Sequence, residues 1–298
     1  QYRDNGIRGV REHYSWQAHA RRYLEIVLPL AQRSERLHRK PLHRRSEVYP
    51  RRAMVSDLDL NLIGGKRSLH KLLKLLREHR KSTLFIIATG RRLDNALKLM
   101  KKHGIPEPDV LITSSGSEIY YAPKLTTDEA WIKHIDYQWS PHKIQEVLDA
   151  IDGLIKQEKQ EQSRFKISYY INPEVLDVET IKSALHNAEI TAHVQVAFGQ
   201  YLDVLPVRAS KGMALRYVAD NLEIPWQNIF VAGGSGADEG MMQGNTMAAV
   251  VANRNHEELS QLVDIDNIYF ASKSHADGIL EALQHYDFFN VTSEKIKN

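Results

Sequence analysis

The chain has 298 residues, enough for one large domain or two smaller ones built around a sizeable hydrophobic core. Hydrophobic residues make up 42% of it and charged residues 26%, which excludes a disordered or fibrous chain, and no apolar run approaches the roughly 20 residues of a membrane-spanning helix. The net charge is +3. The chain has no cysteine, and this absence excludes disulfide bonds, thiolate zinc sites and cysteine nucleophiles.

The N-terminal part of the chain is strongly basic. Residues 1–52 hold 13 Lys+Arg and 5 Asp+Glu, whereas the remaining 246 residues hold 27 and 32. Apolar residues at mostly helical spacing predict a helix within residues 1–31, and residues 32–51 predict a basic linker. An arm that binds nucleic acid or an anionic membrane is the alternative. The linker is favoured because no aromatic residue that would stack on bases lies among the charges from 32 to 48.

Short apolar strands alternate with helices from residue 52 onwards. In the first part, strands are predicted over 52–56, 82–88 and 109–113, separated by helices over 69–78 and 92–103. The alternation returns later, with strands over 228–232, 248–252 and 268–271 and helices over 211–221, 238–244, 256–263 and 275–286. This pattern predicts an α/β fold, with a parallel sheet covered by helices on both faces.

The middle of the chain has a different pattern. Helices are predicted over 141–156 and 178–188, and strands over 165–171, 193–198 and 201–204. We interpret residues 116–207 as an α+β insertion within an α/β domain that is formed by residues 52–115 and 208–290.

Two carboxylates follow the first predicted strand, in the sequence Asp57-Leu58-Asp59. Ligands of parallel sheets bind beyond the carboxyl ends of the strands. There, one carboxylate can attack phosphorus and form an aspartyl-phosphate, while the other protonates the leaving oxygen and later activates water. A turn is the alternative for an Asp-x-Asp pair taken alone.

Three other junctions carry groups suited to anions. Thr89-Gly90-Arg91 follows the second strand, where a hydroxyl and backbone amides can hold phosphate oxygens. Lys211 opens the helix after the insertion, where its charge can neutralise phosphate and keep a nearby carboxylate ionised. A glycine-rich loop precedes Asp238, which can complete a carboxylate cluster for Mg²⁺ or cap a helix. Taken singly, a cap or a surface residue explains each of them.

The order of these four segments, with an insertion between the second and the third, resembles the haloacid dehalogenase-type (HAD) phosphatase superfamily and its cap domain. Residues 113–120, 201–215 and 244–246 look like sucrose-6-phosphate phosphatase. They resemble still more closely the phosphatase-like C-terminal domain of bacterial sucrose-phosphate synthase, and residues 5–16 resemble the last helix of its glycosyltransferase part. The resemblance implies an HAD-like Rossmannoid parallel-sheet core with an inserted α+β cap, preceded by the terminal helix of a glycosyltransferase.

The resemblance also implies roles for single residues. Asp57 matches the nucleophile, Asp59 the acid/base, Thr89 the phosphate-binding threonine and Lys211 the catalytic lysine. It implies Mg²⁺ as the cofactor, with Asp57, Asp59 and Asp238 as its ligands.

The partners follow from the same resemblance. We expect sucrose 6-phosphate as the sugar phosphate and the upstream glycosyltransferase domain of the same polypeptide as a second partner. A membrane or nucleic acid is not expected, and the absence of cysteine and of a secretory signal predicts a cytoplasmic location. Candidates for sugar binding are the aromatic and polar residues of the cap, with core packing as the alternative for each: Trp131, His134, Trp139, Tyr169 and Tyr170.

Departures from the family pattern bear on activity. The last motif of active members reads Gly-Asp-Ser-Gly-Asn-Asp, but Gly234 stands at the first Asp, normally a Mg²⁺ ligand, and Ala237 at the Asn. Asn61 stands where Thr is usual. Removal of one well-placed electrostatic group typically costs on the order of 10²–10³ in rate. We therefore expect weak or absent phosphatase activity and favour a sugar-phosphate-binding or regulatory module, with an active Mg²⁺-dependent phosphatase as the alternative.

Overall fold

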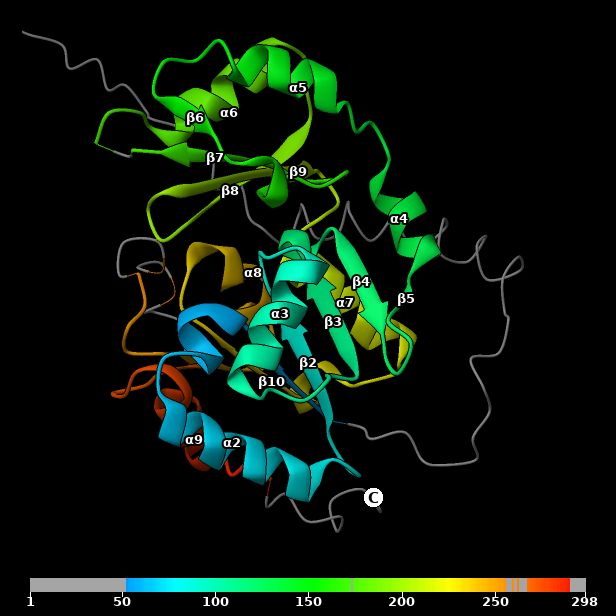
Figure 1. Ribbon diagram of the computed structural model, residues 1–298, viewed down its shortest axis with the longest axis vertical. Helices are drawn as coiled ribbons and strands as arrows, with labels where there is room; N and C mark the ends of the chain where they lie inside the picture. Colours follow the sequence, from blue (N-terminus) through cyan, green and yellow to red (C-terminus); the bar gives the residue numbers. More distant parts are fainter. Residues whose placement is uncertain (1–51, 173, 256–258, 260–261, 263–266, 290–298) are drawn as a thin grey trace, which may run out of the picture. The chain divides into compact units, whose positions relative to one another are not determined.

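The computed structural model describes residues 52–172, 174–255, 259, 262 and 267–289, which belong to one compact unit (Figure 1). The predicted helix within residues 1–31, the linker 32–51 and most of the helix predicted over 256–263 lie outside the described residues. Within the described part of the chain, no helix is long and apolar enough to cross a membrane.

An eight-stranded sheet forms the centre of the fold, in the strand order β12-β11-β10-β1-β2-β3-β4-β5. The strands from β12 to β3 pair in parallel, and β4 and β5 are added antiparallel at one edge. β1 and β10 are buried along their whole length, which suits sequences that are apolar except for Ser56 at the end of β1. The strands are β1 Ala53–Ser56, β2 Leu84–Ala88, β3 Val110–Thr113, β4 Glu118–Tyr121, β5 Thr126–Thr127, β10 Ile229–Gly233, β11 Met247–Val250 and β12 Ile268–Phe270.

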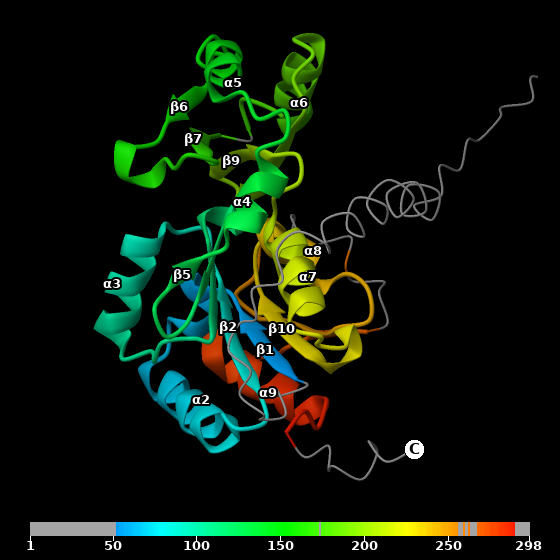
Figure 2. The ribbon, with the colours of Figure 1, turned by 90° about the vertical axis from the view of Figure 1, so that its right-hand side faces the viewer.

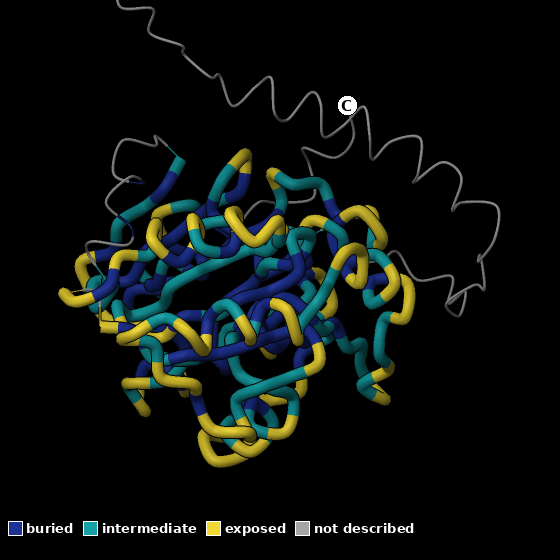
Figure 3. Tube along the Cα trace, turned by 90° about the horizontal axis from the view of Figure 1, so that it is seen from above, coloured by how far each residue is buried: buried dark blue, intermediate teal, exposed yellow. Residues whose placement is uncertain are grey.

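Helices cover both faces of this sheet (Figure 2). Successive residues of β1 point to opposite faces, so Met54 packs with α2, α3 and α9, whereas Val55 belongs to the core beneath α4, α7 and α8. Figure 3 shows the result, with buried strands inside and exposed residues on the outer turns. The helices are α2 Lys66–His79, α3 Leu93–His103, α4 Glu129–Ile135, α7 Lys211–Asn221, α8 Glu239–Met242 and α9 His275–His285.

A second, antiparallel sheet has the strand order β6-β7-β9-β8. Helices α5 Pro141–Leu148 and α6 Val178–Asn187 cover one face of it, around a separate core that includes Tyr169 and Val204 (Figure 1). The chain reaches this sheet after α4 and returns from β9 to α7. The strands are β6 Leu154–Lys156, β7 Ile167–Ile171, β8 Ala192–Ala197 and β9 Tyr201–Pro206.

The predicted α/β class with a parallel-sheet core is confirmed. The helix predicted over 141–156 is wrong beyond Leu148, because Gly153 adopts a left-handed φ of 95° in a turn and residues 154–156 then form β6. The helix predicted over 238–244 is shorter, and α4, β4 and β5 were not predicted.

Candidate active site

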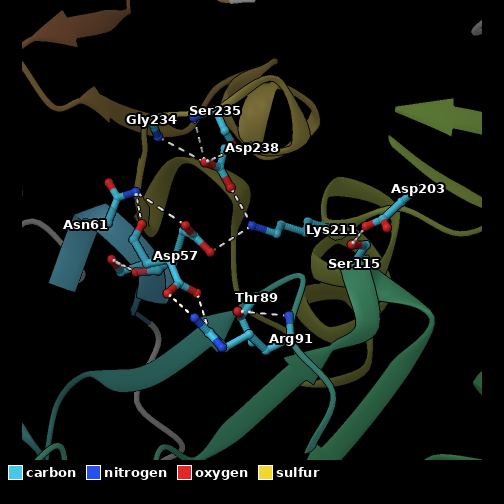
Figure 4. Close-up of polar contacts among 12 residues, drawn as sticks. Asp57, Asn61, Thr89, Arg91, Ser115, Asp203, Lys211, Gly234, Ser235 and Asp238 are labelled. Atoms are coloured by element: carbon cyan, nitrogen blue, oxygen red, sulfur yellow. Dashed lines mark hydrogen bonds and ion pairs between the residues drawn. The ribbon is translucent and has the colours of Figure 1, made fainter. Parts of the chain in front are cut away.

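The loops that carry Asp57, Thr89 and Asp238 meet at one edge of the large sheet, beside Lys211 at the start of α7 (Figure 4). β1 lies between β10 and β2, so the chain segments that follow these three strands are neighbours. The backbone N–H of Asp57 donates to the Ala232 carbonyl over 3.0 Å, which extends the β1–β10 pairing by one residue. This edge is where open α/β sheets bind their ligands.

Lys211 joins two carboxylates inside the protein. Its Nζ lies 2.8 Å from Asp57 Oδ1 and 2.8 Å from Asp238 Oδ1, and the three side chains are at most 4% exposed. Burial lowers the pKa of Lys211, but Asp238 and Asp57 outweigh it and raise that pKa well above the ordinary value, so the ammonium stays charged. Burial raises the pKa of Asp57 to about 7, against the opposing effect of Lys211.

Asp238 has no spare oxygen for a ligand. Its Oδ2 accepts the backbone N–H of Gly234 over 2.9 Å, the N–H of Ser235 over 3.0 Å and the Ser235 hydroxyl over 3.1 Å. These bonds form a capping box at the first turn after β10, and Oδ1 accepts from Lys211. Asp238 thus orders the glycine-rich loop while it compensates the charge of Lys211.

Asp59 is paired with Arg91 rather than with Lys211. The Arg91 guanidinium donates Nε to Asp59 Oδ2 and Nη2 to Oδ1, both over 2.8 Å. Such a two-point pair fits the planar shapes of both groups. The side chains are about one-third exposed, at 37% and 32%, so the pair lies at the rim of the buried cluster.

Thr89 connects this rim to the loop after β3. Its hydroxyl accepts the N–H of Arg91 over 3.2 Å, and its carbonyl accepts the N–H of Ser115 over 3.1 Å. The Ser115 hydroxyl in turn donates to Asp203 of β9 over 2.6 Å. The second sheet therefore makes a direct polar contact with the loops of the candidate site, as Figure 4 shows.

Gly234 faces Asn61 across the site. A Cβ atom added to Gly234 would lie 3.5 Å from Asn61 Nδ2 and 3.1 Å from Val251 Cγ2. Asn61 is buried, and its Nδ2 donates weakly to Asp57 Oδ2 over 3.4 Å and to the Asp59 carbonyl over 3.3 Å. A side-chain amide therefore stands where a side chain at position 234 would enter the site.

The structure brings Asp57, Lys211 and Asp238 into contact and places Asp59 and Thr89 beside Arg91. In the sequence Arg91 is only the last residue of the Thr89-Gly90-Arg91 segment, and its pairing with Asp59 was not predicted. The order of residues along the chain does not predict this ion pair, because the pair depends on how the loops after β1 and β2 are oriented toward each other.

Two of the sugar-binding candidates are buried. Trp131 and Tyr169 are 2% and 1% exposed, because Trp131 packs under the large sheet and Tyr169 under α5 and α6, so neither ring offers a face to a ligand. Trp139 is partly buried and donates its ring N–H to the Arg164 carbonyl, and the His134 carbonyl accepts from Arg208. Tyr170, on the other face of β7, remains accessible.

Solved structures with this fold are HAD-like phosphatases. The HAD subclass IIB sugar phosphatase BT4131 is similar with a TM-score of 0.58 at 15% identity, over 80% of this chain and 100% of that one. This similarity shows that the two proteins share a fold.

A narrower family is shown by the sequence. The family model described as sucrose-6F-phosphate phosphohydrolase matches residues 50–287, and this chain belongs to that family. The sucrose-phosphatase of Synechocystis sp. PCC6803, solved in complex with sucrose and phosphate, has a TM-score of 0.76 and 31% identity, over 80% of this chain and 99% of that one.

Two curated relatives agree with this family. The mannosylfructose-phosphate phosphatase of Agrobacterium fabrum is 28% identical over 242 residues, which are 80% of this chain and 97% of that protein. The probable sucrose-phosphatase 3a of Arabidopsis thaliana is 30% identical over 260 residues, which are 82% of this chain but 61% of that protein.

Proposed function

We propose that this chain binds sucrose 6-phosphate with little or no hydrolysis and acts as a binding or regulatory module of a sucrose-phosphate synthase. The observation that carries the proposal is Gly234, which supplies no side chain where the family pattern has a carboxylate. The similarity to a phosphatase solved with sucrose and phosphate supports the class of ligand. On this proposal residues 52–115 and 208–290 form the core, 116–207 the cap, 1–31 the end of the glycosyltransferase part and 32–51 the linker.

Mg²⁺ is the cofactor that the family implies, and the residues of this site do not fit it as a tightly held ion. Mg²⁺ demands near-octahedral oxygen coordination, usually from one or two carboxylates with phosphate and water. Asp238 already accepts four hydrogen bonds, and each oxygen of Asp59 accepts one from Arg91, so a metal ion would have to share Asp59 with the guanidinium. Among the described residues, no group of three or more His, Asp or Glu side chains is arranged to hold a metal ion.

Binding of a phosphate group needs donors and positive charge, and these are present. We assign the phosphate to the loop before α3, where the Thr89 hydroxyl and the backbone amide of Gly90 would donate to its oxygens while the Arg91 amide donates to the Thr89 hydroxyl. The Arg91 guanidinium and the Lys211 ammonium are the cationic groups of the site, and a phosphate would compete for them with Asp59 and with Asp57 and Asp238. The Ser115–Asp203 contact supports a sugar held between the two sheets, because it brings the second sheet to the edge of this site.

An active phosphatase is the second candidate, and the buried Asp57 is the observation that favours it. Asp57 Oδ2 has one protein donor, Asn61 Nδ2 at 3.4 Å, so this oxygen is available to attack phosphorus. The sugar oxygen would then leave with the bonding electron pair and take a proton from Asp59. The pairing of Asp59 with Arg91 opposes this step, because both carboxylate oxygens of Asp59 are turned to the guanidinium and accept its hydrogen bonds.

The test separates binding from turnover. We would measure sucrose 6-phosphate binding by calorimetry and phosphate release with and without Mg²⁺, for the unmodified chain, Asp57→Asn, Gly234→Asp and the neutral control Gly234→Asn. We expect binding without release from the unmodified chain, and Mg²⁺-dependent release from Gly234→Asp alone. Mg²⁺-dependent release from the unmodified chain that Asp57→Asn abolishes would establish the active phosphatase instead, and absence of binding would refute both.

A further inference from the structure

Positive charge is concentrated in one short part of the described chain. Residues 66–104 hold 12 Lys+Arg and 2 Asp+Glu, whereas the rest of residues 53–298 holds 15 and 30. Residues 53–298 therefore have a negative net charge although they include a segment, residues 66–104, with a charge of +10. This segment contains α2, β2 and α3, and both helices lie on the same side of the large sheet (Figures 1 and 2).

Most of the basic residues of this segment are exposed and have no acidic partner among the described residues. Arg80, Arg91 and Arg92 have acidic partners. The other nine basic residues are exposed, and none of them forms an ion pair with a described residue. We call these nine the basic face: Lys66, Arg67, Lys71, Lys74, Arg77, Lys81, Lys98, Lys101 and Lys102.

The folding of α2 does not account for this charge. The helix is held by its apolar side, Leu69, Leu72 and Leu76, which packs in the core. Its first turn carries Lys66 and Arg67 and no acidic residue, although the positive end of the helix dipole favours acidic side chains there. Lys and Arg residues three or four positions apart along the outer side also repel one another. A local arrangement that opposes stability points to a role outside folding.

The basic face suits recognition by charge alone. The large hydrophobic residues that are exposed in the described chain are Leu60, Tyr137, Ile155, Val175 and Tyr201, and none of them lies in α2 or α3. An amphipathic surface that inserts into lipid presents apolar side chains, and single-stranded nucleic acid is bound with aromatic rings. Neither kind of side chain accompanies these charges.

The acidic residues that surround this segment in the folded unit limit the size of the partner. Residues 53–65 and 105–298 hold 15 Lys+Arg against 30 Asp+Glu, so they repel an extended polyanion, such as a nucleic acid duplex or an anionic bilayer, that reaches past the basic face. A compact acidic surface avoids this repulsion. The 14 residues of α2 span about 21 Å, the length of an ordinary partner helix.

We propose that the basic face is a docking surface for a protein partner that presents an acidic helix or patch. Docking is steered by charge and weakens as salt screens it. The surface is made of residues outside the candidate active site, so partner binding and sugar-phosphate binding can be measured separately.

The test uses short fluorescent poly-L-glutamate as the acidic probe, with anisotropy measured from about 50 to 200 mM salt. Reversal of three charges, Lys71→Glu/Lys74→Glu/Lys98→Glu, should raise the Kd for the probe at least about tenfold. The matched control reverses three exposed, unpaired lysines elsewhere, Lys133→Glu/Lys143→Glu/Lys159→Glu, and should change the Kd less than about twofold. Equal effects of the two variants would overturn the proposal.

A second variant separates docking from folding. Lys66→Gln/Arg67→Gln removes the charges that oppose the helix dipole, so it should raise the melting temperature while it weakens binding of the probe. Parallel titrations with a DNA duplex and with vesicles containing phosphatidylserine identify the class of partner. Tighter binding of either than of poly-L-glutamate, or no binding of the peptide at any salt concentration, would refute the acidic protein.

Discussion

Lys211 and Asp57 are 154 residues apart in the chain, and their charged groups lie 2.8 Å apart in the interior of the protein. Asp238 holds the same ammonium from the opposite loop, so one positive charge is shared by two buried carboxylates. Each of these buried charges is stabilised by its oppositely charged partners. Removal of one of them therefore leaves an uncompensated charge in the interior.

Replacement of Lys211 by Met should therefore destabilise the protein strongly. The apolar side chain keeps most of the volume but leaves Asp57 and Asp238 buried without a cation. Removing one partner of a buried pair costs about 3–5 kcal/mol, so we expect the free energy of unfolding in urea to fall by this amount. Lys133→Met, at an exposed position of α4, is the control and should change it by less than about 0.5 kcal/mol. Similar losses in both variants would show that the buried charge is not responsible.

The raised pKa of Asp57 gives a pH dependence of stability with a definite sign. Folding raises this pKa from 3.8 to about 7, so the folded protein holds the proton more tightly than the unfolded chain does. Between these values the stability contributed by Asp57 falls as pH rises, by at most about 1.4 kcal/mol per pH unit. Asp57→Asn lacks this titration. Urea unfolding from pH 5 to 8 should show the stability of the unmodified chain falling relative to the variant, and parallel profiles would contradict the assignment.

The sequence predicted the parts of this site that depend on position along the chain. Asp57, Thr89 and Asp238 each follow an apolar strand, and parallel strands bring their carboxyl ends to one edge. That rule alone predicts that the three residues lie close together in the folded protein. The same alternation of strands and helices predicted the α/β core.

The remaining features depend on how side chains face one another, which a pattern along the chain does not encode. The pairing of Arg91 with Asp59 and the approach of Asn61 to Gly234 arise between separate loops. Tyr169 and Tyr170 are neighbours in one strand and point to opposite faces of the sheet. Tyr169 is therefore buried in the core and Tyr170 is partly exposed. Composition alone makes both of them equal candidates for sugar binding.

Gly234→Asp should make the stability of the protein responsive to Mg²⁺. The new side chain would enter beside Asn61 Nδ2 and Val251 Cγ2 and add a third carboxylate near Asp57 and Asp238. Like-charge repulsion should lower the melting temperature without metal, and Mg²⁺ at 100 times its Kd would restore about 2.7 kcal/mol. Thermal melts with and without Mg²⁺ check this. Gly234→Asn has nearly the same shape without the charge, and an equal response to Mg²⁺ in that variant would exclude the carboxylate as the cause.

Ser115 and Ser114 provide a matched comparison for the contact between the two sheets. Both are buried and have a left-handed φ, of 60° and 49°, so replacement by Ala has a similar backbone effect at each. The Ser115 hydroxyl donates to Asp203 over 2.6 Å, whereas the Ser114 hydroxyl has no hydrogen-bond partner among the residues that the structure describes. A hydrogen bond to a charged group contributes about 1.5–3 kcal/mol. Ser115→Ala should lower the free energy of unfolding in urea by this amount, and Ser114→Ala by less than about 1 kcal/mol. Because Asp203 also accepts from Ser168, the loss in Ser115→Ala should shrink when Asp203 is first replaced by Asn, and an undiminished loss would show that the two residues are not coupled.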